Sequence, residues 1–255
     1  MDLFDWRKIA MNFDATKDLA LPGDHAQTLD FCVHHWIQVA KEAIENRGRF
    51  HVALSGGSTP NAIYKKLSQP PFREQIDWTK VYLFWGDERS VPIDHPENNY
   101  SNSMQAGFNL LPIPSSQIFR MQAEEHIQEQ AFLYESLLLQ NVPNGQLDLV
   151  MLGMGEDGHT ASLFPNTHAL TVEDRWIIAN YVPQKETWRM TFTYRTIQQA
   201  RHIAIYVIGA QKAAIIKKIF AKESKEFWPI QKVGSKQHKA LWILDHSASQ
   251  LIINH

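Results

Sequence analysis

The sequence predicts an α/β protein in which a largely parallel sheet is covered by helices on both faces. Short apolar runs of strand length alternate with helical segments of a dozen or more residues, which is the order that parallel sheets require. Several segments rich in glycine and charge directly follow the apolar runs, where parallel sheets bind their ligands. No internal repeat, low-complexity tract or linker interrupts residues 1–255, so we expect a single domain.

The composition is that of an ordinary globular protein. The chain has 255 residues, of which 44% are apolar and 20% charged, enough for a substantial core and unlike a disordered chain. A formal net charge of −2 gives no electrostatic reason to expect nucleic acid or an anionic membrane as a partner. The single cysteine, Cys32, fits a reducing compartment, and no apolar run approaches the roughly 18 residues of a membrane span. The first ten residues lack the layout of a signal peptide, so we expect a cytoplasmic protein.

The first predicted helix covers about residues 25–46. Its apolar residues recur mostly at steps of three or four: Leu29, Cys32, Val33, Trp36, Ala40 and Ile44. This spacing places them on one face of a helix that packs on the core. The neighbouring His34 and His35 are interpreted as surface or packing residues.

The remaining elements follow from apolar runs and helical periodicity. We expect strands at 50–55, 80–85, 147–152, 176–182, 189–195, 202–209 and 239–245. We expect helices at 61–68, 121–140 and 210–221, and a short final helix. Four strands end in unusual loops, GGSTP, GDERS, GMGEDGH and GAQK. Because ligands bind beyond the carboxyl ends of parallel strands, these four loops are the candidate site.

The stretch SGGSTP (55–60) has the features of a phosphate-binding loop. Gly56 and Gly57 let the backbone approach a ligand closely, and Ser58 and Thr59 add hydroxyl donors. A helix that begins just beyond offers free amide groups and the positive end of its dipole. No GK[ST] follows, so this is not a nucleotide-triphosphate loop. A tight turn with a Ser/Thr cap is an equally weighted structural alternative.

Two other loops carry charged and titratable groups. In WGDERS (85–90), Arg89 can grip a phosphate or carboxylate through paired hydrogen bonds, although a surface ion pair is the commoner role for such an arginine. The stretch GMGEDGHTASLFP (153–165) places Asp157 and His159 among three glycines. Histidine has an ordinary pKa of about 6.5, which suits a general base near neutrality. A purely structural histidine does not explain so many glycines and acids around it.

Taken together, the motifs resemble those of the 6-phosphogluconolactonase family. SGGSTP, WGDERSVP followed by NNYSN, and GMGEDGHTASLFP occur in the family's order, and RMT (189–191), GAQK (209–212) and LWILDHSA (241–248) continue the likeness over about residues 50–250. The resemblance implies hydrolysis of 6-phospho-D-glucono-1,5-lactone to 6-phospho-D-gluconate in the oxidative pentose phosphate pathway. It also implies an open three-layer α/β/α sandwich with a mostly parallel, Rossmann-like sheet and no nucleotide cofactor.

The same resemblance suggests how the work is divided. His159 would take a proton from the water that attacks C1 and return it to the departing ring oxygen. The loop from Gly56 to Thr59 would hold the phosphate together with Arg189 and Lys212, both of which have an ordinary alternative as solvated basic residues. Such a remote handle would place C1 beside the base.

Two roles stay open at this point. Arg89 either joins the phosphate group or faces the lactone, and Asp157 either orients the imidazole or binds a sugar hydroxyl. No metal is required by this chemistry, and neither an HExxH pattern nor a Cys/His cluster with ligand spacing is present. The absence of a GxSxG elbow disfavours a covalent serine mechanism.

The main competing function is that of the related glucosamine-6-phosphate deaminase/isomerases, which also carry a DGH loop. Those enzymes typically have a glutamate five positions past the histidine, whereas this chain has Phe164. Their second loop reads DEY, whereas Arg89 makes it DER here. Both differences favour the lactonase. A non-catalytic sugar-phosphate sensor is the third hypothesis, weakened because no additional DNA-binding or partner domain is evident.

The expected partner is therefore a small phosphorylated sugar lactone, with no nucleic acid, membrane or cofactor. Oligomeric state is not readable from the sequence. Because no long apolar stripe is left over once the helices are packed, a monomer is favoured.

Overall fold

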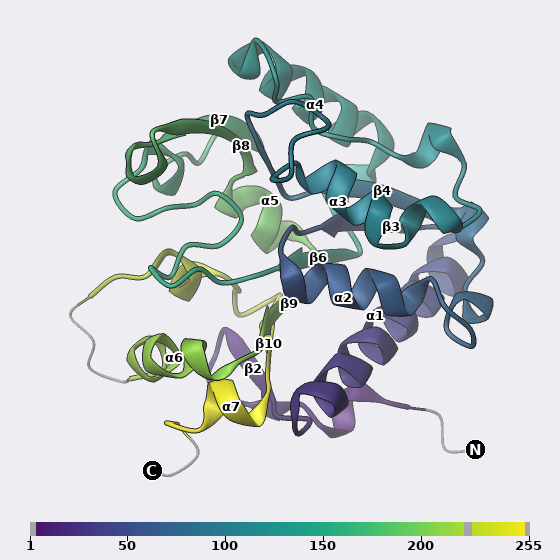
Figure 1. Cartoon of the computed structure of the whole chain (residues 1–255), viewed down its shortest axis with the longest axis vertical. Helices are drawn as coiled ribbons and strands as arrows, with labels where there is room; N and C mark the ends of the chain where they lie inside the picture. The colour runs from purple at the N-terminus through teal and green to yellow at the C-terminus, as the bar shows by residue number, and fades with distance from the viewer. Residues whose placement is uncertain (1–3, 222–225, 253–255) are drawn as a thin grey trace.

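The computed structural model describes residues 4–221 and 226–252 and contains a seven-stranded main sheet (Figure 1). Its strands lie in the order β1 (Met11–Asn12), β2 (Lys17–Ala20), β10 (Ala240–Leu244), β9 (His202–Val207), β6 (Leu149–Leu152), β3 (Phe50–Leu54) and β4 (Val81–Trp85). All neighbouring pairs are parallel except β1 with β2. The predicted, largely parallel sheet is confirmed.

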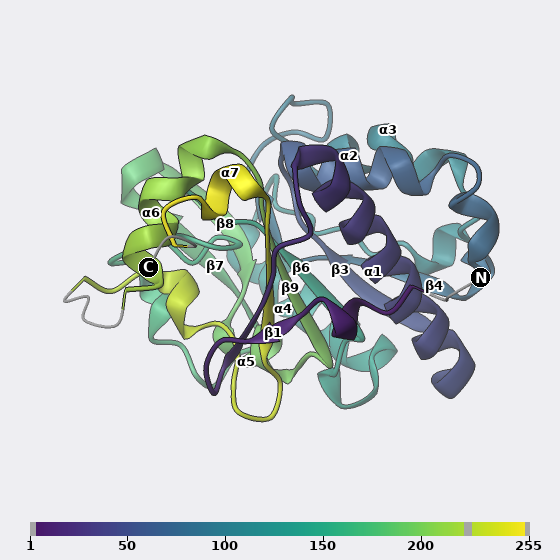
Figure 2. The same ribbon diagram turned by 90° about the horizontal axis from the view of Figure 1, so that it is seen from below.

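Helices cover both faces of this sheet. The α-helices are α1 (His25–Arg47), α2 (Ser58–Leu67), α3 (Asn99–Ala106), α4 (Ile127–Asn141), α5 (Tyr194–Gln199), α6 (Ala213–Ile219) and α7 (His246–Ser249). On one face, Trp36 of α1 packs edge-on against Phe50 of β3 at 5.0 Å between ring centroids. On the other, Phe220 at the end of α6 packs against Trp242 of β10 at 5.0 Å between ring centroids. Figure 2 shows α1 and α6 on opposite sides of the sheet. The predicted three-layer α/β/α arrangement is therefore confirmed.

The predicted first helix lies where its periodicity places it. Asp24 accepts a hydrogen bond from the backbone of Gln27, whose side chain bonds back to the Asp24 backbone, and this capping box starts α1. Cys32 and Trp36 have no exposed surface, as expected of the core face. His35 is also buried, whereas its neighbour His34 is only partly so.

The strand order changes direction between β3 and β6. From β3 the chain moves outward to β4, then returns to place β6 on the other side of β3 and continues through β9 to β10. The loops that follow β3 and β6 consequently diverge to the two faces of the sheet and leave a crevice between them. The GGSTP and GMGEDGH loops are these two loops.

A second, antiparallel sheet is present that the sequence analysis did not foresee. It consists of β5 (Asp87–Arg89), β8 (Thr187–Phe192) and β7 (Ile177–Val182). The strands expected at 176–182 and 189–195 thus lie outside the parallel sheet, because the few residues between them are too short for a parallel crossover. The second strand also ends at Phe192 rather than at 195, since Tyr194 already begins α5.

Three predicted helix boundaries were wrong. The helix expected from residue 121 begins at Ile127, after His126 in a left-handed conformation at φ 49°. The segment 210–221 divides into a 3-10 turn, Ala210–Lys212, and the shorter α6. The helix expected from residue 61 begins at Ser58, so part of the GGSTP motif is itself helical.

Neither edge of the main sheet offers a long free strand. At one edge, β1 has only two residues, both exposed. At the other, the polar groups of β4 are taken by non-strand partners: Gln117 Nε2 donates to the carbonyl of Val81 (2.8 Å), the backbone of Phe119 to that of Leu83 (2.9 Å), and the Trp85 amide donates to the hydroxyl of Tyr134 (3.0 Å). Within residues 4–221 and 226–252, none of the helices combines the length and apolarity of a membrane span.

Candidate active site

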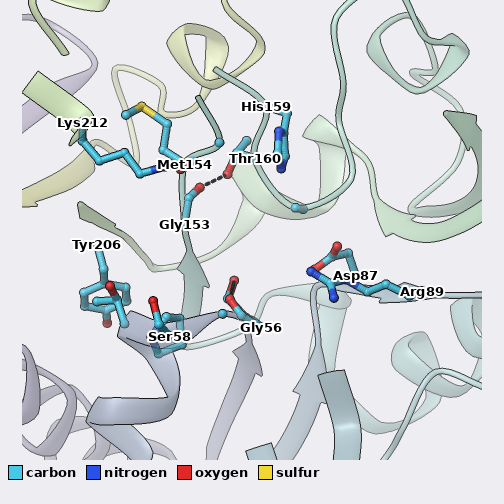
Figure 3. A pocket seen from close by; sticks show the side chains of 16 residues that line it. Gly56, Ser58, Asp87, Arg89, Gly153, Met154, His159, Thr160, Tyr206 and Lys212 are labelled. Carbon is cyan, nitrogen blue, oxygen red and sulfur yellow. Dashed lines mark hydrogen bonds between the residues drawn. The ribbon is translucent and has the colours of Figure 1, made fainter. Parts of the chain in front are cut away.

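The four unusual loops meet around one cavity of about 230 Å³ at the carboxyl edge of the main sheet (Figure 3). Its lining comprises Ser55, Gly56, Gly57, Ser58, Thr59, Pro60, Asp87, Arg89, Gly153, Met154, Gly155, His159, Thr160, Ala161, Tyr206 and Lys212. The cavity thus lies at the change in strand order between β3 and β6, where an open α/β sheet binds ligands.

The start of α2 forms one wall. Gly57 is the N-cap of the helix and has a φ of 108°, a backbone conformation that residues other than glycine rarely adopt. Because glycine has no capping side chain, the first amide groups of α2 lack a side-chain acceptor at this end. The positive end of the helix dipole and these amides make this wall suitable for an anion.

Lys212 approaches the same cavity from the loop after β9. It is the last residue of the 3-10 turn that precedes α6, and its Nζ donates a hydrogen bond to the carbonyl oxygen of Met154 at 2.9 Å. An ammonium group has three donors, so two remain available for a ligand. In Figure 3, Lys212 and Arg89 lie on opposite sides of the cavity.

His159 is held on three sides of its ring. Its Nδ1 lies 2.5 Å from Oδ1 of Asp157, and its face stacks on Phe164 with ring centroids 3.9 Å apart and planes 17° from parallel. At Gly155 the backbone approaches the ring so closely that a Cβ there would lie 2.1 Å from His159. The side chain keeps 27% of its surface exposed. Because Nδ1 is engaged by a carboxylate, Nε2 is the nitrogen free to exchange a proton.

Asp157 contacts the ring of His159 and is not itself among the residues that line the cavity. Burial raises the pKa of its carboxyl, but the hydrogen bond and charge of His159 outweigh burial and leave the pKa below its ordinary value. Asp157 is therefore ionised near neutral pH and offers negative charge to the imidazole. Of the two roles left open by the sequence, this contact matches orientation of the ring.

The two acids of WGDERS have different surroundings. Asp87 lines the cavity, and its Oδ2 accepts a hydrogen bond from Ser162 at 2.7 Å. Glu88 is buried and accepts hydrogen bonds from the backbone of Asn99 and Tyr100, which begin α3. Burial raises the pKa of Glu88 to about 7 despite these bonds. Glu88 thus supports the local fold, whereas Asp87 is a cavity residue that the sequence analysis did not single out.

Arg89 and Arg189 are paired across neighbouring strands of the small sheet. They stand directly opposite each other in the register of β5 and β8. Arg89 lines the cavity, and its guanidinium donates to the carbonyl of Glu97 at 2.8 Å. Arg189 is 8% exposed and is not among the lining residues; burial and the charge of Arg89 lower its pKa. The strand register therefore places Arg189 beside Arg89.

Other lining residues were also missed by sequence reasoning. Thr160 donates from its hydroxyl to the carbonyl of Gly153 at 2.9 Å and so ties the two ends of the histidine loop together (Figure 3). Tyr206 is a buried strand residue of β9, and nothing in its apolar surroundings distinguishes it from core. For Asp87 a signal did exist, because an acid stands two residues beyond the apolar run that ends at Trp85. Among residues 4–221 and 226–252, no group of three or more His, Cys, Asp or Glu side chains is arranged to hold a metal ion.

Comparison with known proteins gives a consistent result. The sequence profile of the family described as glucosamine-6-phosphate isomerases/6-phosphogluconolactonase matches residues 23–242. A protein from Chlamydia pneumoniae named 6-phosphogluconolactonase is 41% identical over 236 residues, which cover 92% of this chain and 90% of that protein. The crystal structure of 6-phosphogluconolactonase from Thermotoga maritima superposes with a TM-score of 0.78 at 26% identity, covering 90% of this chain and 99% of that one.

The fold by itself does not separate the activities within this family. A monomeric glucosamine-6-phosphate deaminase superposes with the same TM-score of 0.78 at 17% identity, covering 91% of this chain and 99% of that one. The distinction therefore depends on residues in the cavity and on the closer sequence relatives.

Proposed function

The chain belongs to the family of glucosamine-6-phosphate isomerases and 6-phosphogluconolactonases, and from this premise we propose that it hydrolyses 6-phospho-D-glucono-1,5-lactone with His159 as general base. The observation that carries the mechanism is the fixed imidazole at the cavity, with Asp157 on Nδ1 and Phe164 against its face. The product is 6-phospho-D-gluconate, formed in the oxidative pentose phosphate pathway. Among the described residues, one hydrophobic core cluster extends from Leu19 to Ala248, which supports the proposal that residues 1–255 form one domain.

The substrate would span the cavity from the start of α2 to His159. The phosphate would lie against Gly56–Thr59 and Lys212, where free amides, hydroxyl groups and an ammonium group converge. The lactone would then face His159 and Arg89. Binding energy at the phosphate is remote from the reacting carbon, so it can position C1 without stabilising the ground state there.

In the reaction, Nε2 of His159 accepts a proton from water as its oxygen bonds to C1. The carbonyl oxygen becomes an oxyanion, and we assign the Arg89 guanidinium, paired with Arg189 on the neighbouring strand, to oppose that negative charge. When the tetrahedral intermediate collapses, the bond from C1 to the ring oxygen breaks and the proton on His159 passes to that oxygen. The products are a carboxylic acid and a free hydroxyl, so His159 ends the cycle neutral. Positioned acid–base catalysis typically contributes about 10²–10⁴ in rate.

Phe164 argues against deamination by the same site. Its ring stacks on His159 at 3.9 Å, in the position where a deaminase would carry a proton-transferring glutamate. A phenyl ring has no proton to move.

The proposed partner is a small phosphorylated lactone, without nucleic acid, membrane or cofactor, and we favour a monomer. We also propose that the protein is cytoplasmic, because its single cysteine fits a reducing compartment.

The proposal is tested with freshly prepared 6-phosphogluconolactone, following acid release above the spontaneous rate, beside glucosamine 6-phosphate assayed for ammonia. We expect lactone opening without ammonia, and loss of at least about 10²-fold in kcat for His159→Asn. His168→Asn is the matched control, because His168 is exposed and lies outside the cavity lining. Ammonia release that equals lactone opening, or near-normal turnover by a folded His159→Asn variant, would refute the assignment.

A further inference from the structure

A second cavity lies at the opposite edge of the main sheet and has no place in the proposed reaction. It measures about 270 Å³, and its lining includes Arg47, Arg49, Gln146, Asp148 and Arg201. Arg49 immediately precedes β3, Asp148 precedes β6 and Arg201 precedes β9. The cavity is therefore formed where three neighbouring parallel strands begin, whereas the candidate active site lies where they end.

Among the described residues that line this cavity, Asp148 carries the one carboxylate beside the three guanidinium groups. Asp148 is 2% exposed, and its Oδ1 accepts a hydrogen bond from Nε of Arg47 at 2.8 Å. Nε of Arg201 is more distant, at 3.6 Å. The other oxygen, Oδ2, accepts from the backbone of His51 at 2.8 Å. Burial raises the pKa of Asp148, but the hydrogen bonds from His51 and the charge of Arg47 outweigh it, and the carboxylate stays ionised.

The fold accounts for one of the three arginines. Arg47 is the last residue of α1, where a positive charge compensates the negative end of the helix dipole, and it also neutralises Asp148. Arg49 makes no hydrogen bond or ion pair with any described residue. Among the described residues, the Arg201 guanidinium has only its long contact with Asp148. Arg49 and Arg201 line the same cavity as Arg47, although the like charges of their guanidinium groups repel one another.

We propose that this cavity binds a small phosphate-bearing anion through the free ends of the three guanidinium groups. Arg47 and Arg201 each direct Nε toward Asp148. Their terminal guanidinium nitrogens have no hydrogen-bond partner among the described residues. Paired N–H donors match the oxygens of a phosphate, and the amide of Gln146 adds a neutral donor at the rim. A cavity of 270 Å³ admits a compact polyanion such as a diphosphate group.

The exposure of the site sets the strength of binding. The Arg47 and Arg201 side chains are 33% and 40% exposed, so water and salt screen their charges in part. We therefore expect a Kd in the range of cellular metabolite concentrations, and this Kd should increase as ionic strength rises. A shallow site on a long groove would suit nucleic acid, but this cavity is confined to the start of three strands.

The test uses inorganic pyrophosphate, titrated by calorimetry into the full-length protein at low ionic strength. A Lys212→Ala background weakens any binding at the first cavity. We expect one pyrophosphate per chain in this background, with affinity reduced about 10-fold or more by the further change Arg49→Ala. Because Arg49 makes no hydrogen bond or ion pair with any described residue, the melting temperature without ligand should not fall.

The matched control is Arg195→Ala, which removes the same charge from an exposed position on α5. It should leave pyrophosphate affinity within about twofold of its parent. Equal losses in the Arg49 and Arg195 variants would mean bulk electrostatics and overturn the proposal. So would binding that disappears with Lys212→Ala alone, or heat indistinguishable from dilution at millimolar pyrophosphate.

Discussion

Replacing Asp157 by asparagine should lower kcat about 10- to 30-fold while KM changes little. Asparagine keeps an oxygen near Nδ1 of His159 but removes the negative charge that stabilises the imidazolium formed during catalysis. At about 4 Å between charge centres, such a pair attracts by about 1 kcal/mol in water and about 4 kcal/mol near a protein surface. The side chains are 27% and 41% exposed, so the lower half of this range applies, about 1.5–2 kcal/mol. KM should hold because Asp157 does not line the cavity.

The assay is steady-state hydrolysis of 6-phosphogluconolactone, corrected for spontaneous opening at each substrate concentration. Glu156→Gln removes the same charge one residue away, from an exposed side chain, and should leave kcat within about twofold. If both variants lose equal activity, the effect is one of net charge and the Asp157–His159 contact is not special. A large rise in KM for Asp157→Asn alone would instead assign this carboxylate to a sugar hydroxyl.

Three other changes test separate parts of the structure. Phe164→Leu removes the ring stacked on His159, an interaction of about 0.5–1.5 kcal/mol, and should lower kcat about two- to tenfold in the same assay with KM unchanged. Lys212→Ala should raise KM for the phosphorylated lactone about 10- to 100-fold and leave unphosphorylated gluconolactone almost unaffected; equal losses on both would contradict a phosphate contact. Burial lowers the pKa of His35 to about 3, so below pH about 6.5 the unfolded chain binds a proton that the folded chain does not, and stability falls by up to about 1.4 kcal/mol per pH unit. In urea unfolding between pH 7 and 4, His35→Phe should reduce this acid dependence, and an unchanged slope would mean that other groups cause it.

The strands β3, β4, β6, β9 and β10 of the parallel sheet were predictable because they are largely buried and therefore appear as uninterrupted apolar runs, whereas the exposed β1 and the half-buried β2 were not predicted. The small sheet was not predictable, since Asp87–Arg89 has no apolar pattern and forms a strand only because β8 supplies a partner. The gap between Val182 and Thr187 did contain the necessary signal, because so short a connection allows only antiparallel pairing. Helix α4 shows the opposite error: residues 121–126 favour helix locally, but His126 adopts a left-handed conformation that ends any such helix.

The same distinction applies to the site. Loops at the ends of parallel strands must share one edge, so the meeting of Ser58, Arg89, His159 and Lys212 around one cavity follows from strand order. The contact of Phe164 with His159 does not follow, because it depends on how five residues of irregular loop turn back on themselves. Arg189 could be placed near Arg89 only once the antiparallel register was known.

The closed edges of the main sheet limit how two copies of this chain can meet. Unpaired N–H and C=O groups along an edge strand act as a template on which another chain extends the sheet. Here β1 offers only two residues for such pairing, and the outward groups of β4 are already bonded to Gln117, Phe119 and Tyr134. A second chain therefore finds no row of unpaired backbone groups at either edge of the main sheet on which to add a strand. Self-association through the main sheet therefore has to use side-chain surfaces, and this sheet should resist edge-driven aggregation at the high protein concentrations found in cells.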